Sequence, residues 1–259
     1  MRQGLPEAVV RRTNPVTRYG LRLTLAIVAI LLVTVPFSFL LFQVLLEGPL
    51  TEIDGDLADR LNHAVRDNDA AVTALQAVSR LGWPPVLWIV AASSILYTWR
   101  QGALRLSVFL LATTVGGGVL STVVKVLVDR PRPLVDHPVA TALGKSFPSG
   151  HALSSTVVYG AVLLTFLPVL SRRLRHLAVA LTVVLVLAIG ASRLALGVHF
   201  LSDVVGGYVL GVAWLVAATA VFETWRVDRG RRPSHPLEEG VEPEEAPALQ
   251  DEGGRVTRV

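Results

Sequence analysis

The chain has 259 residues and a formal net charge of +4, with 52% hydrophobic and only 17% charged residues. Its mean hydropathy of +0.54 is too high for an ordinary soluble domain and is typical of a protein with several membrane spans. The arginines stand in short runs beside apolar segments, which argues against a nucleic-acid partner. The absence of cysteine excludes a disulfide framework, a thiolate nucleophile and Cys-ligated zinc.

Six continuously apolar segments are predicted to form transmembrane helices. The first is too long for the core of a signal peptide and is not followed by a cleavage site of small residues, so we expect it to be retained. Because apolar residues do not alternate with polar ones, the expected fold is an all-α, polytopic bundle. The six segments cover residues 21–46, 84–99, 104–124, 149–170, 177–192 and 201–222.

The distribution of arginine predicts the orientation of these helices. Arginine groups precede the first segment, separate the second from the third and the fourth from the fifth, and follow the sixth. With six spans all four groups lie on one side, which the positive-inside rule makes cytoplasmic. We therefore expect a multi-pass protein of the cell membrane with both termini in the cytoplasm and the acidic connector 47–83 outside.

Composition also predicts how the chain is divided. Residues 1–20 form a cytoplasmic N-terminal segment, 21–225 a membrane domain, and 226–259 a disordered cytoplasmic tail, which is first basic and then acidic with proline and glycine. Inside the connector, Asn68 and Asp69 are good cap residues for a short amphipathic helix that Gly82 ends. This helix is either a packed connector or a gate for a lipid.

Polar residues recur at the outer ends of the third to sixth predicted spans. Ionisable groups at membrane depth are costly and indicate function. Each residue alone also has a structural explanation: Lys125 could be an interfacial anchor and Ser149 a helix cap. Their convergence on one face favours a shared site. The group comprises Lys125, Arg130, Arg132, the sequence Phe147-Pro148-Ser149-Gly150-His151, Ser192, Arg193, His199 and Asp203.

This set of side chains suits an anion. It has no cluster of carboxylates for magnesium and no His-Glu-x-x-His pair, so neither a metal nor another cofactor is expected. Arginine and lysine side chains, with N–H groups at the helix start beside Gly150, neutralise phosphoryl oxygens. His199 and Asp203 stand four residues apart, which on a helix places them on one face. The carboxylate could then fix the imidazole tautomer, while His151 protonates a leaving oxygen.

Three motifs resemble the signatures of the type 2 phosphatidic acid phosphatase superfamily, in its membrane lipid phosphatase branch. They are Lys125-x6-Arg132-Pro133, Pro148-Ser149-Gly150-His151 and Ser192-Arg193-x5-His199-x3-Asp203. The resemblance implies a six-helix bundle with an outward-facing site and a metal-independent phosphohistidine reaction. It implies three catalytic residues, the nucleophile His199, its partner Asp203 and the general acid His151. It further implies phosphate-binding roles for Lys125, Arg132, Ser149, Gly150 and Arg193.

The function implied by this resemblance is hydrolysis of a lipid phosphomonoester or diphosphate within the bilayer. Undecaprenyl diphosphate, phosphatidylglycerophosphate and phosphatidic acid all suit the motifs, which carry no information on the lipid tail or the oligomeric state. A phosphotransferase with the same histidine chemistry stays open, whereas a transporter would need polar groups near the bilayer midplane. The six-residue gap from Lys125 selects Arg132, which leaves Arg130 as a second phosphate contact or an interfacial anchor.

Overall fold

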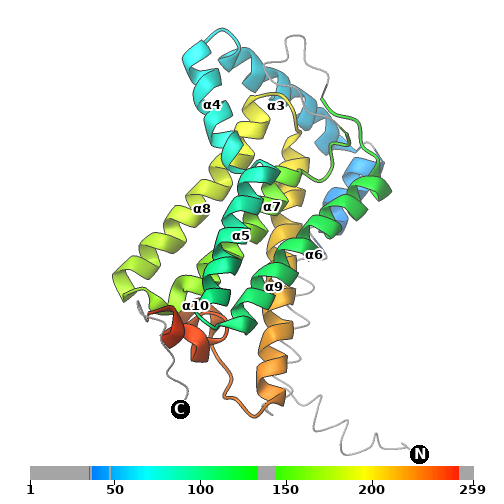
Figure 1. Cartoon of the computed structure of the whole chain (residues 1–259). Helices are drawn as coiled ribbons and strands as arrows, with labels where there is room; N and C mark the ends of the chain where they lie inside the picture. Colours follow the sequence, from blue (N-terminus) through cyan, green and yellow to red (C-terminus); the bar gives the residue numbers. More distant parts are fainter. Residues whose placement is uncertain (1–34, 36, 47, 134–143, 251–259) are drawn as a thin grey trace, which may run out of the picture.

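The computed structural model describes residues 35, 37–46, 48–133 and 144–250, and these residues form helices and no strand (Figure 1). Most of the first predicted span lies outside the described residues, although residues 37–45 are helical. Four later helices are long and apolar enough to cross a membrane, and a bent pair of helices can supply a fifth crossing. An all-helical membrane protein is therefore confirmed, with four to five candidate spans in the described part of the chain.

The membrane bundle is built around one central helix, α7 (Gly150–Phe166). It contacts every other long helix of the bundle, and well over half of its span is buried. Large apolar side chains on the outer helices, such as Val126, Leu187 and Val216, remain exposed, as expected for a surface that faces lipid. The surrounding helices are α5 (Pro84–Arg100), α6 (Leu104–Val128), α8 (Arg172–Ala195) and α9 (Leu201–Asp228).

Glycines on α9 allow it to approach α7 closely. A Cβ added at Gly211 would lie 2.8 Å from Thr156 Cβ, and one added at Gly207 would lie 2.7 Å from the carbonyl oxygen of Ser149. The two glycines are four residues apart, the spacing of small residues that brings membrane helices together. The start of α7 is therefore held directly against the start of α9.

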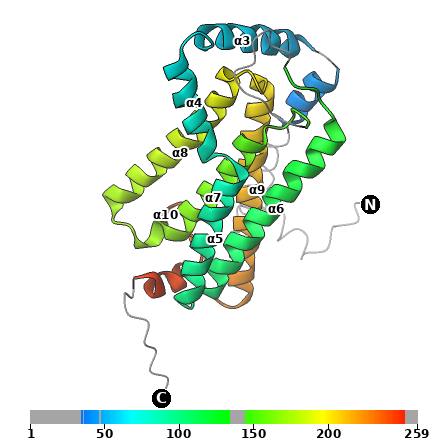
Figure 2. The same ribbon diagram turned by 45° about the horizontal axis from the view of Figure 1, so that its top comes forward.

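The acidic connector forms two helices that cover one end of the bundle. The predicted amphipathic helix is confirmed as α4 (Asp69–Leu81), whose N-cap residue Asn68 accepts a hydrogen bond from Ala71 N–H. It packs against α8 and meets α5 at a bend of 41°, so it belongs to the bundle. The helix before it, α3 (Pro49–Val65), was not anticipated and lies across the end of the bundle, against α8 and α9 (Figure 2).

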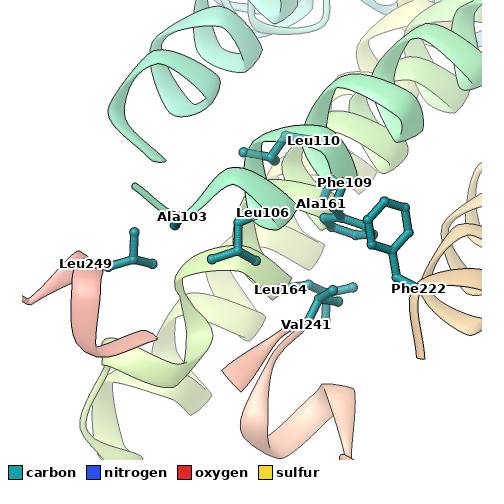
Figure 3. Close-up of a cluster of buried hydrophobic side chains, with 9 residues drawn as sticks. All are labelled: Ala103, Leu106, Phe109, Leu110, Ala161, Leu164, Phe222, Val241 and Leu249. Carbon is teal, nitrogen blue, oxygen red and sulfur yellow. The ribbon is translucent and has the colours of Figure 1, made fainter. Parts of the chain in front are cut away.

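The opposite end is closed by the C-terminal segment, which corrects the expectation of a disordered tail for residues 226–250. This segment forms α10 (Pro236–Glu239) and the 3₁₀ helix η2 (Pro243–Leu249). Val241 and Leu249 are buried in an apolar cluster with residues of α6, α7 and α9, such as Phe109 and Phe222 (Figure 3). Composition alone missed these contacts because few apolar residues suffice when a preformed bundle supplies the remainder of the cluster.

Ion pairs between the tail and the basic connectors accompany this apolar contact. Glu242 is fully buried and pairs with Arg105 at 2.9 Å and with Arg231 at 3.1 Å. Arg226 pairs with Glu244 at 2.6 Å, and Arg175 donates a hydrogen bond to the carbonyl oxygen of Glu238. Three of the four predicted arginine groups therefore meet at one end of the bundle, opposite α3 and α4. The fourth group precedes the described residues.

Candidate active site

The residues singled out from the sequence come together at the end of the bundle covered by α3 and α4. A cavity of about 950 Å³ opens there between α4, α5, α6, α7 and α8. Six of the eight predicted site residues line it: Lys125, Arg132, Gly150, His151, Arg193 and His199. The other two, Ser149 and Asp203, are fully buried behind this wall. Cationic or imidazole-bearing side chains from four parts of the chain therefore line the cavity, namely Arg80 and the stretches 125–132, 145–151 and 193–199.

His199 and Asp203 form the buried pair that the spacing predicted, but not in the predicted way. His199 lies before α9, in the connection from α8, so the two residues do not share a helical face. Asp203 instead caps the first turn of α9, where its Oδ2 accepts the N–H of Phe200 at 2.9 Å. The same oxygen lies 3.3 Å from His199 Nδ1. A proton on Nδ1 can bond this carboxylate, which leaves the lone pair of Nε2 directed at the cavity.

Burial lowers the pKa of the His199 imidazole to about 4, against the opposing effect of the Asp203 carboxylate; the positive charges of Arg132 and Arg193 lower it further. A base with a pKa below its usual range of about 6.5 stays unprotonated at neutral pH. His199 is therefore present as the neutral imidazole, the form that can act as a nucleophile.

Two guanidinium groups and an ammonium group surround His199. Arg132 Nη1 lies 3.2 Å from His199 Nε2 and also donates to the carbonyl oxygen of Val198. Its Nε donates to the carbonyl oxygen of Gly144. Arg193 is held by a 2.6 Å hydrogen bond from Nη1 to Ser79 Oγ of α4. These contacts orient two planar donor groups toward one space, as anion binding requires.

Lys125 completes the cationic wall from the last turn of α6. The predicted span ended one residue before it, whereas α6 continues to Val128. Its Nζ donates a 2.8 Å hydrogen bond to the carbonyl oxygen of Lys145, and the Lys145 side chain pairs with Asp129. The ammonium group is thus fixed between the helix and the connection that leads to α7, and it faces the cavity.

Ser149 and Gly150 occupy different places at the start of α7. Gly150 lines the cavity, whereas Ser149 is the N-cap residue and its backbone N–H donates to the carbonyl oxygen of Asp203. The hydroxyl of Ser149 is buried and has no hydrogen-bond partner among the described residues. The structure therefore brings Gly150 and His151 to the cavity, but it places the Ser149 hydroxyl behind its wall.

Arg130 and Arg132 have separate surroundings. Arg132 lines the cavity, as the six-residue gap from Lys125 predicted. Arg130 is 9% exposed and does not line it; its Nη1 donates to Asp203 Oδ1 at 2.8 Å. Arg130 is thus neither an interfacial anchor nor a residue of the cavity wall in this structure.

Several residues around the site were missed in the sequence. Ser79 holds Arg193, Ser146 donates to the carboxylate of Asp203, and Asp54 of α3 pairs with Arg130 at 2.9 Å. Serine is common at helix caps and packed turns, so its type alone carries no signal. Asp54 is one of seven acidic residues in the connector 47–83, and nothing in its sequence surroundings distinguishes it from the others.

The donor set of the site matches an anion. Within residues 35–133 and 144–250, as far as they are described, no group of three or more His, Asp or Glu side chains is placed to hold a metal ion. The residues that line the cavity instead carry three guanidinium groups, two ammonium groups and two imidazoles, beside the start of a helix. This arrangement can bind a phosphoryl group, and it places an unprotonated imidazole nitrogen beside it.

Comparison with known proteins agrees with this chemistry. Residues 106–226 match the model of the PAP2 superfamily. Over these residues the chain is similar to that superfamily. All eight predicted site residues lie inside the matched segment, as do the three motifs that carried the resemblance.

Two curated relatives are named as phosphatases. Phosphatidylglycerophosphatase B of Bacillus subtilis is 36% identical over 133 residues, which cover 49% of this chain and 62% of the relative. Decaprenylphosphoryl-5-phosphoribose phosphatase of Mycobacterium tuberculosis is 40% identical over 97 residues, 36% of this chain and 48% of the relative. The chain therefore matches less than two thirds of the length of each.

A solved structure shares the fold. It is the crystal structure of a transmembrane PAP2 type phosphatidylglycerolphosphate phosphatase from Bacillus subtilis, with a TM-score of 0.62 and 24% sequence identity. The match covers 74% of this chain and 94% of that chain. The arrangement of helices around the site is thus that of a known membrane protein fold.

The close contact of α9 with α7 generates a prediction. We expect Gly207→Ala to lower the stability of the protein by about 1–3 kcal/mol, because the added Cβ would meet the Ser149 carbonyl oxygen and Ala152 Cβ. Thermal unfolding of the purified protein in detergent measures this. Gly55→Ala is the matched control, since a Cβ there meets nothing within 4 Å. Equal unfolding temperatures for Gly207→Ala and wild type would contradict the packing described.

Proposed function

We propose that the chain is an integral membrane phosphatase that hydrolyses a lipid phosphomonoester or diphosphate through a phosphohistidine intermediate. The observation that carries this proposal is the placement of His199 Nε2 beside Arg132 in a cavity lined by cationic groups. A nucleophile, an acid and anion-binding groups from three stretches of the chain (125–132, 150–151 and 193–199) share one space. The match of residues 106–226 to the PAP2 superfamily and the names of the two relatives support the same reaction class.

In the proposed first step, His199 Nε2 attacks phosphorus in line with the leaving oxygen. The P–N bond forms as the P–O bond to the lipid breaks, and Asp203 stabilises the positive imidazole through Nδ1–H. Lys125, Arg132 and Arg193 bind the equatorial oxygens, whose charge changes as the phosphoryl group transfers. His151, which lines the same cavity, gives its proton to the departing lipid oxygen.

In the proposed second step, water hydrolyses the phosphohistidine. His151, now neutral, takes a proton from the attacking water, while the P–N bond breaks and returns the electron pair to Nε2. Inorganic phosphate leaves and the starting protonation states are restored. One residue therefore acts first as acid and then as base, and the three cationic side chains hold the phosphoryl group throughout both steps.

Apolar cavities next to the site support a lipid substrate. A small cavity of about 50 Å³ shares Pro84, Trp88, Gly118 and Ser154 with the site. A further cavity of about 530 Å³ shares Trp88 and runs between α5 and α6, where apart from Ser107 its lining is apolar. An apolar lipid tail can lie along this path while the phosphate occupies the cationic cavity. A small soluble phosphate ester has no apolar tail that would fill the path.

The distribution of charge supports an extracytoplasmic site. The basic connectors meet at the end of the bundle that carries α10, and the acidic helix α3, together with α4, covers the end that contains the site. The positive-inside rule places the basic end in the cytoplasm. The proposed enzyme therefore acts on lipids of the outer leaflet of the cell membrane. The names of the relatives favour phosphatidylglycerophosphate among the three lipids named above, and they add a prenyl-linked sugar phosphate.

The central test is phosphate release by the purified protein in detergent with a metal chelator present. We expect release from phosphatidylglycerophosphate or from a prenyl phosphate, and His199→Ala should lower kcat by about a thousandfold or more because it removes the nucleophile. His176→Ala, a change of a histidine at the start of α8 outside the cavity, is the matched control. Activity that survives in His199→Ala, or a requirement for a metal ion, would contradict the proposed mechanism.

The apolar path proposed for the lipid tail generates a second prediction. Gly118 lines both the site and the small cavity, and a Cβ added there meets nothing within 4 Å, so Gly118→Leu should narrow the path where these two spaces meet. We expect KM for the lipid substrate to rise about tenfold, while kcat/KM for p-nitrophenyl phosphate stays unchanged. Val119→Leu, on the exposed neighbouring residue, is the control. An equal loss for both substrates in Gly118→Leu would show that this path does not hold the tail.

A further inference from the structure

Arg130 is a buried cation that the proposed reaction does not use. Its guanidinium group bridges two carboxylates: Nη1 lies 2.8 Å from Asp203 Oδ1, and Nη2 lies 2.9 Å from Asp54 Oδ2. Nη1 also donates to Ser202 Oγ at 2.7 Å, and the guanidinium carbon lies 4.2 Å above the centre of the Phe200 ring. These contacts fix the plane of the group, and both carboxylates are almost completely buried.

Asp54 brings α3 into this arrangement. Its Oδ1 accepts the backbone N–H of Ser202 at 2.9 Å, and its Oδ2 accepts the Ser202 hydroxyl as well as Arg130. Ser202 is in the first turn of α9, directly before Asp203. A buried carboxylate with three donors is costly to place unless it is paired. α3 is thereby joined to the residue that orients His199.

We propose that Asp54 and Arg130 are positioning residues of the active site, which hold Asp203 in the orientation and the charge state that His199 needs. The inference rests on the proposed phosphatase function and adds α3 to its machinery. Neither residue reaches the cavity, so neither contacts the substrate. Arg130 binds Oδ1 of Asp203, so Oδ2 is available to His199 together with Ser146 and the Phe200 N–H, while Asp54 balances the charge of Arg130.

The charges of Asp54, Arg130 and Asp203 alternate in sign. The positioning role therefore predicts an effect on His199 that a purely structural role would not produce. Electrostatic interactions link His199 to Asp203 of α9, Arg193 of α8, His151 of α7 and Arg132 of the connection after α6. The other charged groups that line the same cavity are Arg80 of α4, Lys125 of α6 and Lys145. Loss of the Arg130 charge leaves Asp203 a stronger attraction for a proton on His199, so the pKa of His199 rises. Loss of the Asp54 charge leaves Arg130 less neutralised, so the pKa of His199 falls. Substitutions at the two partners of one ion pair thus shift the pKa of His199 in opposite directions.

The test uses Asp54→Asn, Arg130→Gln, the double variant and Arg130→Lys in the full chain. We expect the acid limb of the pH profile, where kcat/KM falls at low pH, to move by about half a pH unit or more. It should move to higher pH for Arg130→Gln and to lower pH for Asp54→Asn. The double variant should return toward wild type. Arg130→Lys keeps the positive charge but loses the bridge between Asp203 and Asp54. The acid limb of this variant should therefore stay in place, while kcat falls about tenfold or more.

Two exposed residues of α3 provide matched controls. Asp56 and Arg60 have side chains that are 75% and 80% exposed, and Asp56→Asn and Arg60→Gln should leave both kcat and the acid limb unchanged. Thermal unfolding of every variant separates loss of fold from loss of orientation. Acid limbs that stay in place in both Asp54→Asn and Arg130→Gln, or that move in the same direction, would overturn the inference.

A readout that is independent of activity separates this inference from the proposed function. NMR titration of the histidine-labelled protein in detergent follows the His199 imidazole directly, and the spectrum of His199→Ala assigns its signal among the six histidines. Opposite shifts of the His199 pKa without any phosphate release would support the positioning role and contradict the phosphatase. Phosphate release with unshifted titrations would support the phosphatase and contradict the positioning role.

Discussion

The contact between Asp203 and His199 depends on a carboxylate that is held away from water in a single orientation. A buried, unpaired charge would cost several kcal/mol, so the protein surrounds Asp203 with donors. Arg130 binds one oxygen, while Ser146, the Phe200 N–H and His199 share the other. Each donor comes from a different part of the chain or from the cap of α9 itself. The positions of α3, α6, α7 and α9 at this end of the bundle are therefore coupled to one side chain.

The bundle supplies this geometry through close helix packing. Small residues let α9 approach the start of α7, so that the Ser149 N–H reaches the Asp203 carbonyl oxygen. The opposite end is closed by charged and apolar contacts of the C-terminal segment with α6, α7 and α9. The site thus lies at the end of rigid helices, while the two connections that carry Arg132 and His199 position the side chains that face the phosphate. Preorganised donors of this kind lower the cost of charge redistribution during transfer.

Much of the site could be predicted from the sequence because its signals are local. The motif that contains Lys125 and Arg132 and the motif that contains His199 and Asp203 each span only a few residues. Asn68 is a typical N-cap residue and so indicates the start of α4. Contacts between distant segments carry no such signal. Asp54 resembles its exposed neighbour Asp56 in sequence, and only the fold shows that one is buried against Arg130. The prediction of a disordered C-terminal segment was wrong for the same reason. The composition of the segment does not reveal that the basic connectors of the bundle bind Glu242.

The most direct test of the account is the identity of the atom that carries the phosphoryl group between the two steps. Rapid quenching of the enzyme with a lipid labelled in its phosphate, followed by peptide mapping under alkaline conditions, locates that atom. The account predicts an acid-labile label on the peptide that contains His199, formed before inorganic phosphate appears and absent from His199→Ala. A label on another residue, or transfer directly to water without a covalent intermediate, would contradict it.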